Sequence, residues 1–351
     1  MDIYEKLREK IDKSIPIAMP ATKGRAEIEI LRRLIAPDEA EIAMLLSGQP
    51  ESAAVIAQRG GMSTDQLRPT LEALVKKGAI FKVYTEDPLY SLATMMPGIY
   101  EFQVDRLTPD MVALFEQYYH DGHAEAIFNN KTAFARVLPV NKSIFPEMNV
   151  YTYEEVERII DNATAVTLAT CLCRSNKKLI GQGCDAPVED ACILLDSWAD
   201  YYAENGLGRR VSKEEGKTAL KRAEEAGLVH NSLNVQDGSL FICNCCGCCC
   251  ALLRGITELA IPTSVARSNF IAAVSAENCT GCGICEERCQ IHAVSVVDEV
   301  STIDEVRCIG CGVCVSGCPA DAVSMRRREE DVKVPGNLND LMMKIAEGRT
   351  V

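Results

Sequence analysis

Apolar residues recur along the chain at two spacings, three to four residues apart in some blocks and two residues apart in others. The clearest block lies at 36–92. The last of three helices expected in this block should begin at Ser63, with Gln66 at the capping-box position, and end before Gly78. Pro69 lies inside this helix, so the helix is expected to start or to kink at that residue. The predicted elements are helices at Pro37–Leu46, Glu51–Gln58 and Ser63–Lys77, then a hairpin of Gly78–Tyr84 and Leu89–Leu92.

Three helices followed by a hairpin form the winged-helix arrangement, which is common among DNA-binding proteins. The charge of this block argues against DNA. Residues 36–100 contain eight acidic and five basic side chains, and Arg68 is the only base in the first half of the third helix. Because binding to phosphates needs a basic surface, we expect contact with a protein partner instead of nucleic acid.

The remaining blocks predict helices at Ala26–Leu34, Pro109–Tyr119, Tyr153–Ala163 and Leu338–Ala346, with a proline-punctuated stretch at 137–148. This mixture predicts a modular α+β fold with no single large sheet. The expected units are an N-terminal helical segment (1–35), a winged-helix-like domain (36–100), a helical connector (101–165), a Cys-rich α+β domain (166–262), a second Cys-rich domain (263–330) and a tail (331–351).

Two runs near the C-terminus repeat the spacing C-x₂-C-x₂-C-x₃-C, 29 residues apart. The repeat extends beyond the cysteines, since Ala293–Val296 corresponds to Ala322–Met325, so a duplicated unit with pseudo-two-fold symmetry explains it. Glycines between the cysteines allow the backbone to wrap closely around a bound group. The runs contain Cys279, Cys282, Cys285 and Cys289, and Cys308, Cys311, Cys314 and Cys318.

This spacing is the ligand pattern of bacterial-type two-cluster [4Fe–4S] ferredoxins, and residues 275–327 resemble that family. Three thiolates of a run hold one cube and the fourth reaches the other cube. Zinc sites or a disulfide knot are the alternatives, but zinc ligands usually form two separated pairs. Gln290 stands where the family usually has proline, as at Pro319, and we expect it to alter loop rigidity without altering ligation. The expected ligands are Cys279, Cys282, Cys285 and Cys318 for one cluster, and Cys308, Cys311, Cys314 and Cys289 for the other.

Ten further cysteines lie within residues 166–262. A buried strand at Val166–Thr170 is expected to deliver Cys171 and Cys173 from its end, where residues two apart point the same way. Cys192 is expected to begin a helix that runs to about Ala203. The pattern brings two strand ends with paired cysteines together, and the candidate metal ligands are Cys171, Cys173, Cys184, Cys192, Cys243, Cys245, Cys246, Cys248 and Cys249.

Sites made only of thiolates favour iron–sulfur clusters or zinc. Beside a ferredoxin-like domain we expect one or two further [4Fe–4S] clusters, with zinc as the alternative. Cys248, Cys249 and Cys250 cannot all face one cluster, so some of them are redox-active or act as buried apolar side chains. We expect His230, beside this loop, to be structural.

Most of the chain also resembles a family of multi-cluster iron–sulfur proteins from anaerobic bacteria and archaea. The resemblance implies a winged-helix-like N-terminal part and a role in electron transfer, and it implies no defined reaction. The matching pieces are Cys171–Arg174, Gly181–Cys192, Gly227–His230, Ile242–Cys250 and Val265–Phe270.

The composition narrows the setting. The 18 cysteines and the charged, leader-free start predict metal-bound thiolates in the reducing cytoplasm of an anaerobic or microaerobic host. No apolar run is long enough for a membrane helix, so membrane attachment would need a partner subunit. The net charge of −13 disfavours nucleic acid and suits basic docking surfaces of redox proteins.

These features predict an electron-transfer protein, or a subunit of an oxidoreductase, that relays low-potential electrons between donor and acceptor proteins. The sequence shows no nucleophile–base pair, phosphate loop or dinucleotide fingerprint, which makes a stand-alone enzyme the less favoured interpretation. Two alternatives remain: a reductase that acts at Cys243–Cys250, and a redox-sensing regulator that binds DNA through the winged helix.

Overall fold

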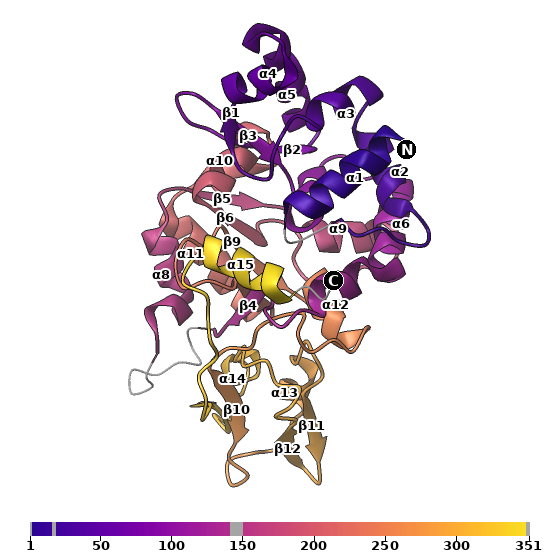
Figure 1. The fold of residues 1–351 in the computed structure, drawn as a ribbon. Helices are drawn as coiled ribbons and strands as arrows, with labels where there is room; N and C mark the ends of the chain where they lie inside the picture. Colours follow the sequence, from indigo (N-terminus) through magenta and orange to yellow (C-terminus); the bar gives the residue numbers. More distant parts are fainter. Residues whose placement is uncertain (1, 16–18, 141–149, 349–351) are drawn as a thin grey trace.

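The computed structural model describes residues 2–15, 19–140 and 150–348. The N-terminal helices lie at one end, a sheet occupies the middle, and the C-terminal Cys-rich region lies at the other end (Figure 1). One buried apolar cluster joins the N-terminal helices to the middle region; it contains, for example, Leu7, Leu31, Tyr201 and Phe241. The first two regions therefore share a core.

The N-terminal region follows the predicted order of elements with two differences: Ile3–Ser14 forms an additional helix, and Glu51–Ser52 forms a short strand where a helix was expected to begin. Helix α5 begins after Ser63, whose Oγ accepts a hydrogen bond from the Gln66 amide (3.3 Å), while Gln66 Oε1 accepts from the Ser63 amide (3.0 Å). The predicted capping box is confirmed, whereas the helix continues through Pro69. The elements are α1 (Ile3–Ser14), α2 (Ala26–Leu34), α3 (Pro37–Ala43), β1 (Glu51–Ser52), α4 (Ala53–Gly60), α5 (Thr64–Lys76), β2 (Ile80–Val83) and β3 (Leu89–Leu92), with sheet order β1-β3-β2.

A helical segment leads from this region to the middle of the molecule. It consists of the turns η1 (Met95–Ile99) and η2 (Glu101–Gln103), then α6 (Pro109–Tyr118), η3 (Tyr119–His123) and α7 (Ala124–Phe128). An aromatic cluster fixes the N-terminal region against α10 (Asp196–Glu204), because Phe81 and Phe102 stack around Tyr201 with ring centroids 5.0 and 4.4 Å away. Tyr201 Oη also donates to the Val75 carbonyl (3.1 Å).

The middle region is built on one antiparallel sheet of six strands in the order β4-β8-β9-β6-β5-β7. The prediction of a fold without a large sheet was therefore wrong. Short strands far apart in sequence pair here, and strand β4 comes from the stretch that was expected to be a helical connector. The strands are β4 (Ala135–Leu138), β5 (Val166–Ala169), β6 (Cys192–Leu195), β7 (Gly208–Val211), β8 (Val229–Leu233) and β9 (Phe241–Cys245).

The two faces of this sheet are covered differently. Ile193, Leu195 and Ile242 pack with α8 (Val156–Asn162) and α11 (Lys213–Glu225) on one face. Side chains alternate along a strand, so Cys192 and Cys243, which are adjacent to Ile193 and Ile242, face the other side of the sheet. Helices α9 (Leu172–Leu179) and α12 (Ala251–Thr257) lie on that side. The second face therefore holds the chemistry.

The C-terminal region contains two antiparallel strand pairs, β10–β13 and β11–β12, each followed or preceded by a short helix. The third cysteine of each run, Cys285 or Cys314, is the second residue of one of these helices, as the repeat predicts. Its elements are β10 (Phe270–Val274), α13 (Ile284–Glu287), β11 (Val294–Val297), β12 (Val300–Ile303), α14 (Val313–Ser316) and β13 (Val323–Arg327).

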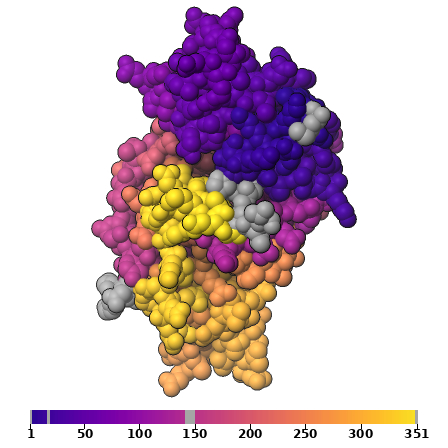
Figure 2. Space-filling model, in the orientation of Figure 1, coloured from indigo at the N-terminus to yellow at the C-terminus, as the bar shows by residue number. Residues whose placement is uncertain are grey.

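The tail returns to the middle region. Helix α15 (Leu338–Gly348) lies across the face of the molecule in Figures 1 and 2, and it buries Leu341 and Ile345 in the shared core. The Asn130 side chain donates to the Ile345 carbonyl (3.0 Å). Most of the predicted stretch at 137–148 lies outside the described residues. Among the described residues, no helix is both long enough and apolar enough to span a membrane.

Candidate metal centres

The cysteine loops of the C-terminal region require glycine at two equivalent positions. Gly281 and Gly310 have φ of +65° and +75°, and a Cβ at these positions would lie 2.5 Å from the Glu299 carbonyl oxygen and 2.1 Å from that of Phe270. A side chain would therefore be strained and would also displace backbone. The tight loops predicted from the sequence depend on this lack of side chains.

Backbone amides point at the cysteine sulfurs of both repeats. The Ala293 amide donates to Cys289 Sγ (3.1 Å), and the equivalent Ala322 amide donates to Cys318 Sγ (3.3 Å). The Ser301 amide donates to Cys279 Sγ at 3.4 Å. Such donors stabilise thiolates, so these residues fit an iron–sulfur cluster whose sulfurs accept hydrogen bonds.

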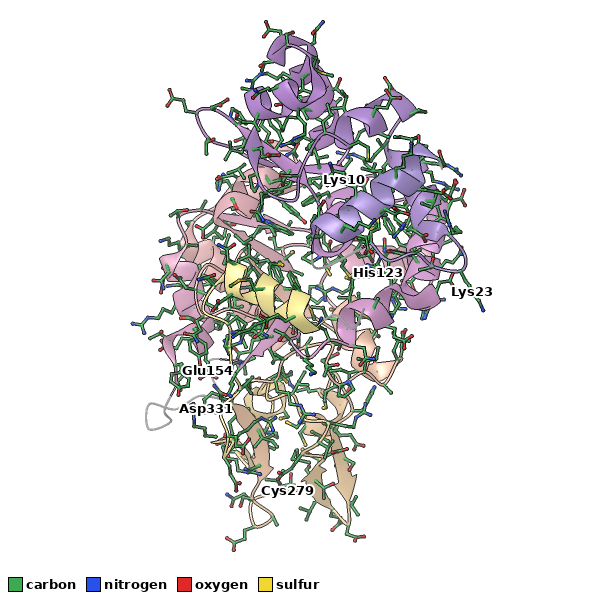
Figure 3. The ribbon with its side chains drawn as sticks, viewed as in Figure 1. Lys10, Lys23, His123, Glu154, Cys279 and Asp331 are labelled. Carbon is green, nitrogen blue, oxygen red and sulfur yellow. The ribbon has the colours of Figure 1, made fainter. Side chains whose placement is uncertain are left out.

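The structure brings the fourth cysteine of the first run to the second run. Burial, reinforced by Cys308 and then Cys289, raises the pKa of Cys314 to about 12, which reflects thiols gathered in one place. Burial also raises the pKa of Cys311, with Cys314, Cys289 and Cys308 adding to the effect. Cys279 lies near the end of this region that points away from the sheet, as Figure 3 shows, and Cys282 is exposed.

Residues 278–323 match the family model described as a 4Fe-4S dicluster domain. The C-terminal region is thus a ferredoxin-type iron–sulfur domain, called the dicluster domain below. No curated protein sequence and no solved structure gives a significant match to the chain.

The ten central cysteines form two separate sets. The first set, called the four-thiol set, consists of Cys184, Cys246, Cys248 and Cys249, whose sulfurs lie within 4.8 Å of one another. The Sγ–Sγ distance is 3.7 Å between Cys184 and Cys246, 3.8 Å between Cys184 and Cys249, and 3.7 Å between Cys248 and Cys249. Hydrogen bonding from Cys249, together with the nearby charge of Arg174, lowers the pKa of Cys246 to about 4. This lowered pKa favours the thiolate form of Cys246, which is the form that binds a metal ion.

The second set, called the six-thiol set, lines a cavity of about 90 Å³ on the sheet face described above. The rest of the lining is largely apolar and includes Met96, Phe128 and Leu252. Hydrogen bonds to neighbouring thiols and burial raise the pKa of Cys171, Cys243 and Cys245 well above the usual value, so these groups stay protonated unless a metal ion displaces the proton. The six are Cys171, Cys173, Cys192, Cys243, Cys245 and Cys250.

Three sequence predictions for these cysteines need correction. The predicted strand before Cys171 is present as β5, but Cys171 and Cys173 do not extend it; Cys171 is the N-cap of α9, and Cys173 lies in its first turn. Cys192 begins strand β6, not a helix, because its run to Leu195 pairs with β5 and β9. Cys250, left out of the candidate ligands, lines the cavity as the N-cap of α12.

A buried arginine lies between the two sets. Arg174 has no exposed surface, and its Nη1 donates to the Asn244 carbonyl (2.9 Å) and approaches Cys246 Sγ (3.9 Å). Burial opposes its charge, but Cys171 and Cys246 raise the pKa of Arg174. Its Nε and Nη2 have no hydrogen-bond partner among the described residues. These two donors fit an anionic group held by the thiols.

An ion-pair network fixes the two helices that begin at the cavity. Glu116 of α6 receives Lys177 of α9 at 2.9 Å and Arg254 of α12 at 2.8 Å. Arg254 also lies over the Tyr119 ring, 4.6 Å from its centroid. The sequence offered no local signal for this network, since its three charged residues come from distant helices.

His230 has a structural partner, in line with the sequence prediction. Its Nδ1 lies 2.6 Å from Asn244 Oδ1, and burial lowers the pKa of His230 to about 4, which keeps the ring neutral at neutral pH. The Asn244 amide donates to the Ala191 carbonyl (3.1 Å). Asn244 is thereby held on the face opposite Cys243 and Cys245.

The dicluster domain docks directly on the central cysteine loop. The Gly247 amide donates to Gln290 Oε1 (2.9 Å), and Gln290 Nε2 donates to the Gly227 carbonyl (3.0 Å). A Cβ on Gly247 would lie 1.8 Å from the Gln290 carbonyl oxygen. The departure from proline after Cys289 thus has a structural role that the sequence did not indicate.

A larger pocket adjoins the six-thiol cavity. Its volume is about 730 Å³, and α15 forms part of its wall. It shares Pro97, Phe134 and Phe241 with the lining of the cavity. Glu101 also lines the cavity; its Oε2 accepts from the Gly98 amide (2.7 Å), and burial raises the pKa of this carboxyl to about 8.

Proposed function

We propose that the chain is an iron–sulfur electron-transfer protein, or the electron-transfer subunit of an oxidoreductase, that passes low-potential electrons between a partner protein and its central cysteine sites. In this proposal the dicluster domain carries two [4Fe–4S] clusters, on the ligand sets predicted from the sequence. The clusters supply one-electron redox chemistry. The chain's own residues hold them, exclude water and set the route between domains.

The contact between the dicluster domain and the central region carries this proposal. Cys245 and Cys250 share one apolar core with Cys285, Cys308 and Cys314. Gln290, next to a predicted cluster ligand, bonds to the backbone between Cys246 and Cys248. The two cysteine-rich regions thus share a buried core and a direct hydrogen bond, which supports electron transfer between them.

The opposite end of the dicluster domain suits a partner. Cys282 is exposed and Cys279 is partly exposed there, so electrons can enter or leave at that end. The net charge of −13 favours basic docking surfaces on a donor or acceptor. The partners are proteins of the cytoplasm of an anaerobic or microaerobic host, and membrane attachment, where it occurs, comes from another subunit.

The winged-helix-like module is part of the same proposal and serves as a protein-contact or packing unit. Arg68 and Lys77 of this module lie within salt-bridge distance of Asp87 (3.8 Å) and Glu39 (2.5 Å). Bases paired in this way contribute little to phosphate binding. Nucleic acid is therefore not the proposed partner.

Freeze-quench EPR tests the relay. The full chain, purified without oxygen, is mixed with a reduced viologen dye, and the signals of the dicluster domain and of the central region are followed over time. We expect reduction of the dicluster domain first and of the central region later, with the second step slower in Gln290→Pro and unchanged in Pro319→Gln. Central reduction with the same rate in all three proteins would overturn the proposed route.

A second candidate function is favoured by the adjoining pocket. The pocket is lined by aromatic rings that include Phe81, Phe102 and Trp198, and its shared wall with the six-thiol cavity would bring an apolar small molecule close to the cysteines. A reductase that acts at Cys243–Cys250 would use this arrangement. The test is oxidation of reduced viologen by lipoamide, an apolar disulfide, with Trp198→Ala expected to raise KM. Absence of turnover by metal-replete protein would leave the relay as the function.

A further inference from the structure

We infer that the ten central cysteines form two chemically different metal sites: the four-thiol set binds a single zinc ion, and the six-thiol set, including Cys250, binds an iron–sulfur centre. This deepens the proposed function, on which it rests, because the six-thiol set becomes the centre that exchanges electrons with the dicluster domain. The four-thiol set becomes a fixed, redox-inactive clamp beside it.

The size of the four-thiol set fits one ion. Zinc held by thiolates at about 2.3 Å in a tetrahedron places its sulfurs about 3.8 Å apart. Three of the Sγ–Sγ distances in the set are 3.7, 3.8 and 3.7 Å, and all four sulfurs lie within 4.8 Å of one another. The thiolates of a [4Fe–4S] cube lie farther apart, since each is bound to a different iron. Four cysteines without an open position match the usual structural zinc site.

The position of the four-thiol set explains what the ion would do. Cys246, Cys248 and Cys249 lie on the loop that receives Gln290 through Gly247. A bound ion ties this loop to Cys184, which comes from a separate loop before β6. The zinc would therefore hold the docking surface of the dicluster domain in place.

Strand geometry separates the two sets. Cys243 and Cys245 of β9 point to the same face, and Asn244 between them is fixed on the opposite face by His230. Cys192 is the register partner of Cys243 on β6. The next residue, Cys246, belongs to the four-thiol set. Adjacent cysteines are thus divided between the sites by the backbone itself.

The six-thiol set is larger than one zinc ion requires and is continuous. Thiol–thiol interactions run from Cys192 to Cys243, Cys245, Cys250, Cys173 and Cys171. One zinc or one cube takes four ligands, so the six thiols that line this largely apolar cavity supply a full ligand set for an iron–sulfur centre, with two thiols to spare. Fully buried Arg174 follows Cys173 directly in α9, and its Nε and Nη2 have no partner among the described residues, so it adds positive charge beside the two sets.

Metal analysis of the full chain, produced without oxygen, tests the inference. We expect about one zinc per chain, and about eight iron in the dicluster domain plus at least about four more in the six-thiol set. Cys248→Ser removes the exposed member of the four-thiol set and should lose the zinc while retaining the iron. Cys245→Ser should lose about four iron while retaining the zinc.

A matched control and a measurement without variants keep the test decisive. Cys279→Ser should lower iron by about four and leave the zinc and central iron unchanged. In the unaltered protein, zinc-edge X-ray absorption should show four sulfur neighbours at about 2.3 Å and no iron neighbour.

Different failures have different meanings. Total iron below about eight would overturn the proposed function itself. About eight iron, unchanged by Cys245→Ser, would overturn only the six-thiol site. Iron in place of zinc in the four-thiol set, or oxygen and nitrogen neighbours at the zinc edge, would overturn the zinc assignment.

Discussion

The dicluster domain and the central region both gather cysteines, but they do so over different lengths of chain. In the dicluster domain, Cys308, Cys311 and Cys314 follow one another within a short stretch of chain, and Cys289 from the first run lies beside them. In the central region the six-thiol set draws on residues as distant as Cys171 and Cys250, from two strands and two helix starts. The dicluster cysteines are thus mostly close along the chain, whereas the central set exists only where distant strands and helices meet.

The difference extends to how each region stabilises its sulfurs. The dicluster domain uses backbone amides from its own repeats, as at Cys289 and Cys318. The central region uses a buried side chain, Arg174, which approaches Cys246 across the fold. We therefore expect substitutions outside the cysteines to harm the central sites far more than the dicluster domain.

Arg174→Met should have the largest effect. It removes a buried positive charge that faces thiolates, and such a loss costs about 3 kcal/mol or more in the free energy of unfolding. Central metal content should fall while about eight iron remain in the dicluster domain. Metal analysis and anaerobic urea unfolding measure both quantities. Arg174→Lys, which keeps the charge without the planar donors, should be intermediate. Unchanged central metal in Arg174→Met would show that the two regions do not differ in this respect.

Gln290→Pro should have the next largest effect. It restores the residue usual after the fourth cysteine of a run but removes two hydrogen bonds that join the regions, for a loss of about 2 kcal/mol. Iron in the dicluster domain should stay constant, because no ligand changes. Urea unfolding and limited proteolysis at the junction measure the loss. Pro319→Gln, at the equivalent position of the second run, is the control, and equal destabilisation by both variants would contradict a docking role for Gln290.

A smaller, pH-dependent effect is expected at the wall of the six-thiol cavity. The pKa of Glu101 is about 8 in the folded chain and 4.5 in the unfolded chain. Between these values the folded chain holds the extra proton, so the free energy of unfolding falls as pH rises from about 4.5 to 8. Glu101→Gln should remove this part of the pH dependence. Identical unfolding curves against pH for both proteins would refute it.

The smallest effect is expected where the fold is local. Ser63→Ala removes the N-cap of α5 and should cost about 1 kcal/mol, with no change in metal content. Hydrogen exchange of the amides of the first turn of α5 measures the loss, and Ser63→Thr, which retains the hydroxyl, should restore protection. A change in central metal content would mean that the N-terminal region and the metal sites are coupled.

The sequence by itself determined what depends on neighbouring residues. The ferredoxin-type repeat, with glycines such as Gly281 and Gly310 in its loops, follows from spacing, because a few consecutive residues build each loop. The capping box at Ser63 and the bounds of α5 follow from the same local rules. The ligand assignments themselves stay predictions, although the structure places Cys289 beside the second run.

Only the tertiary structure decided how the ten central cysteines divide. The way the Cys192 side chain points depends on whether its segment is a strand or a helix. The segment is a strand because it pairs with β5 and β9, which are distant in sequence, so the expected helix does not form there. The division between Cys245 and Cys246 depends on which face of the sheet is covered, and the roles of Arg174 and Gln290 depend on groups far away in sequence. Spacing carries no information about such contacts, because they arise from burial and from the pairing of strands that are distant in the chain.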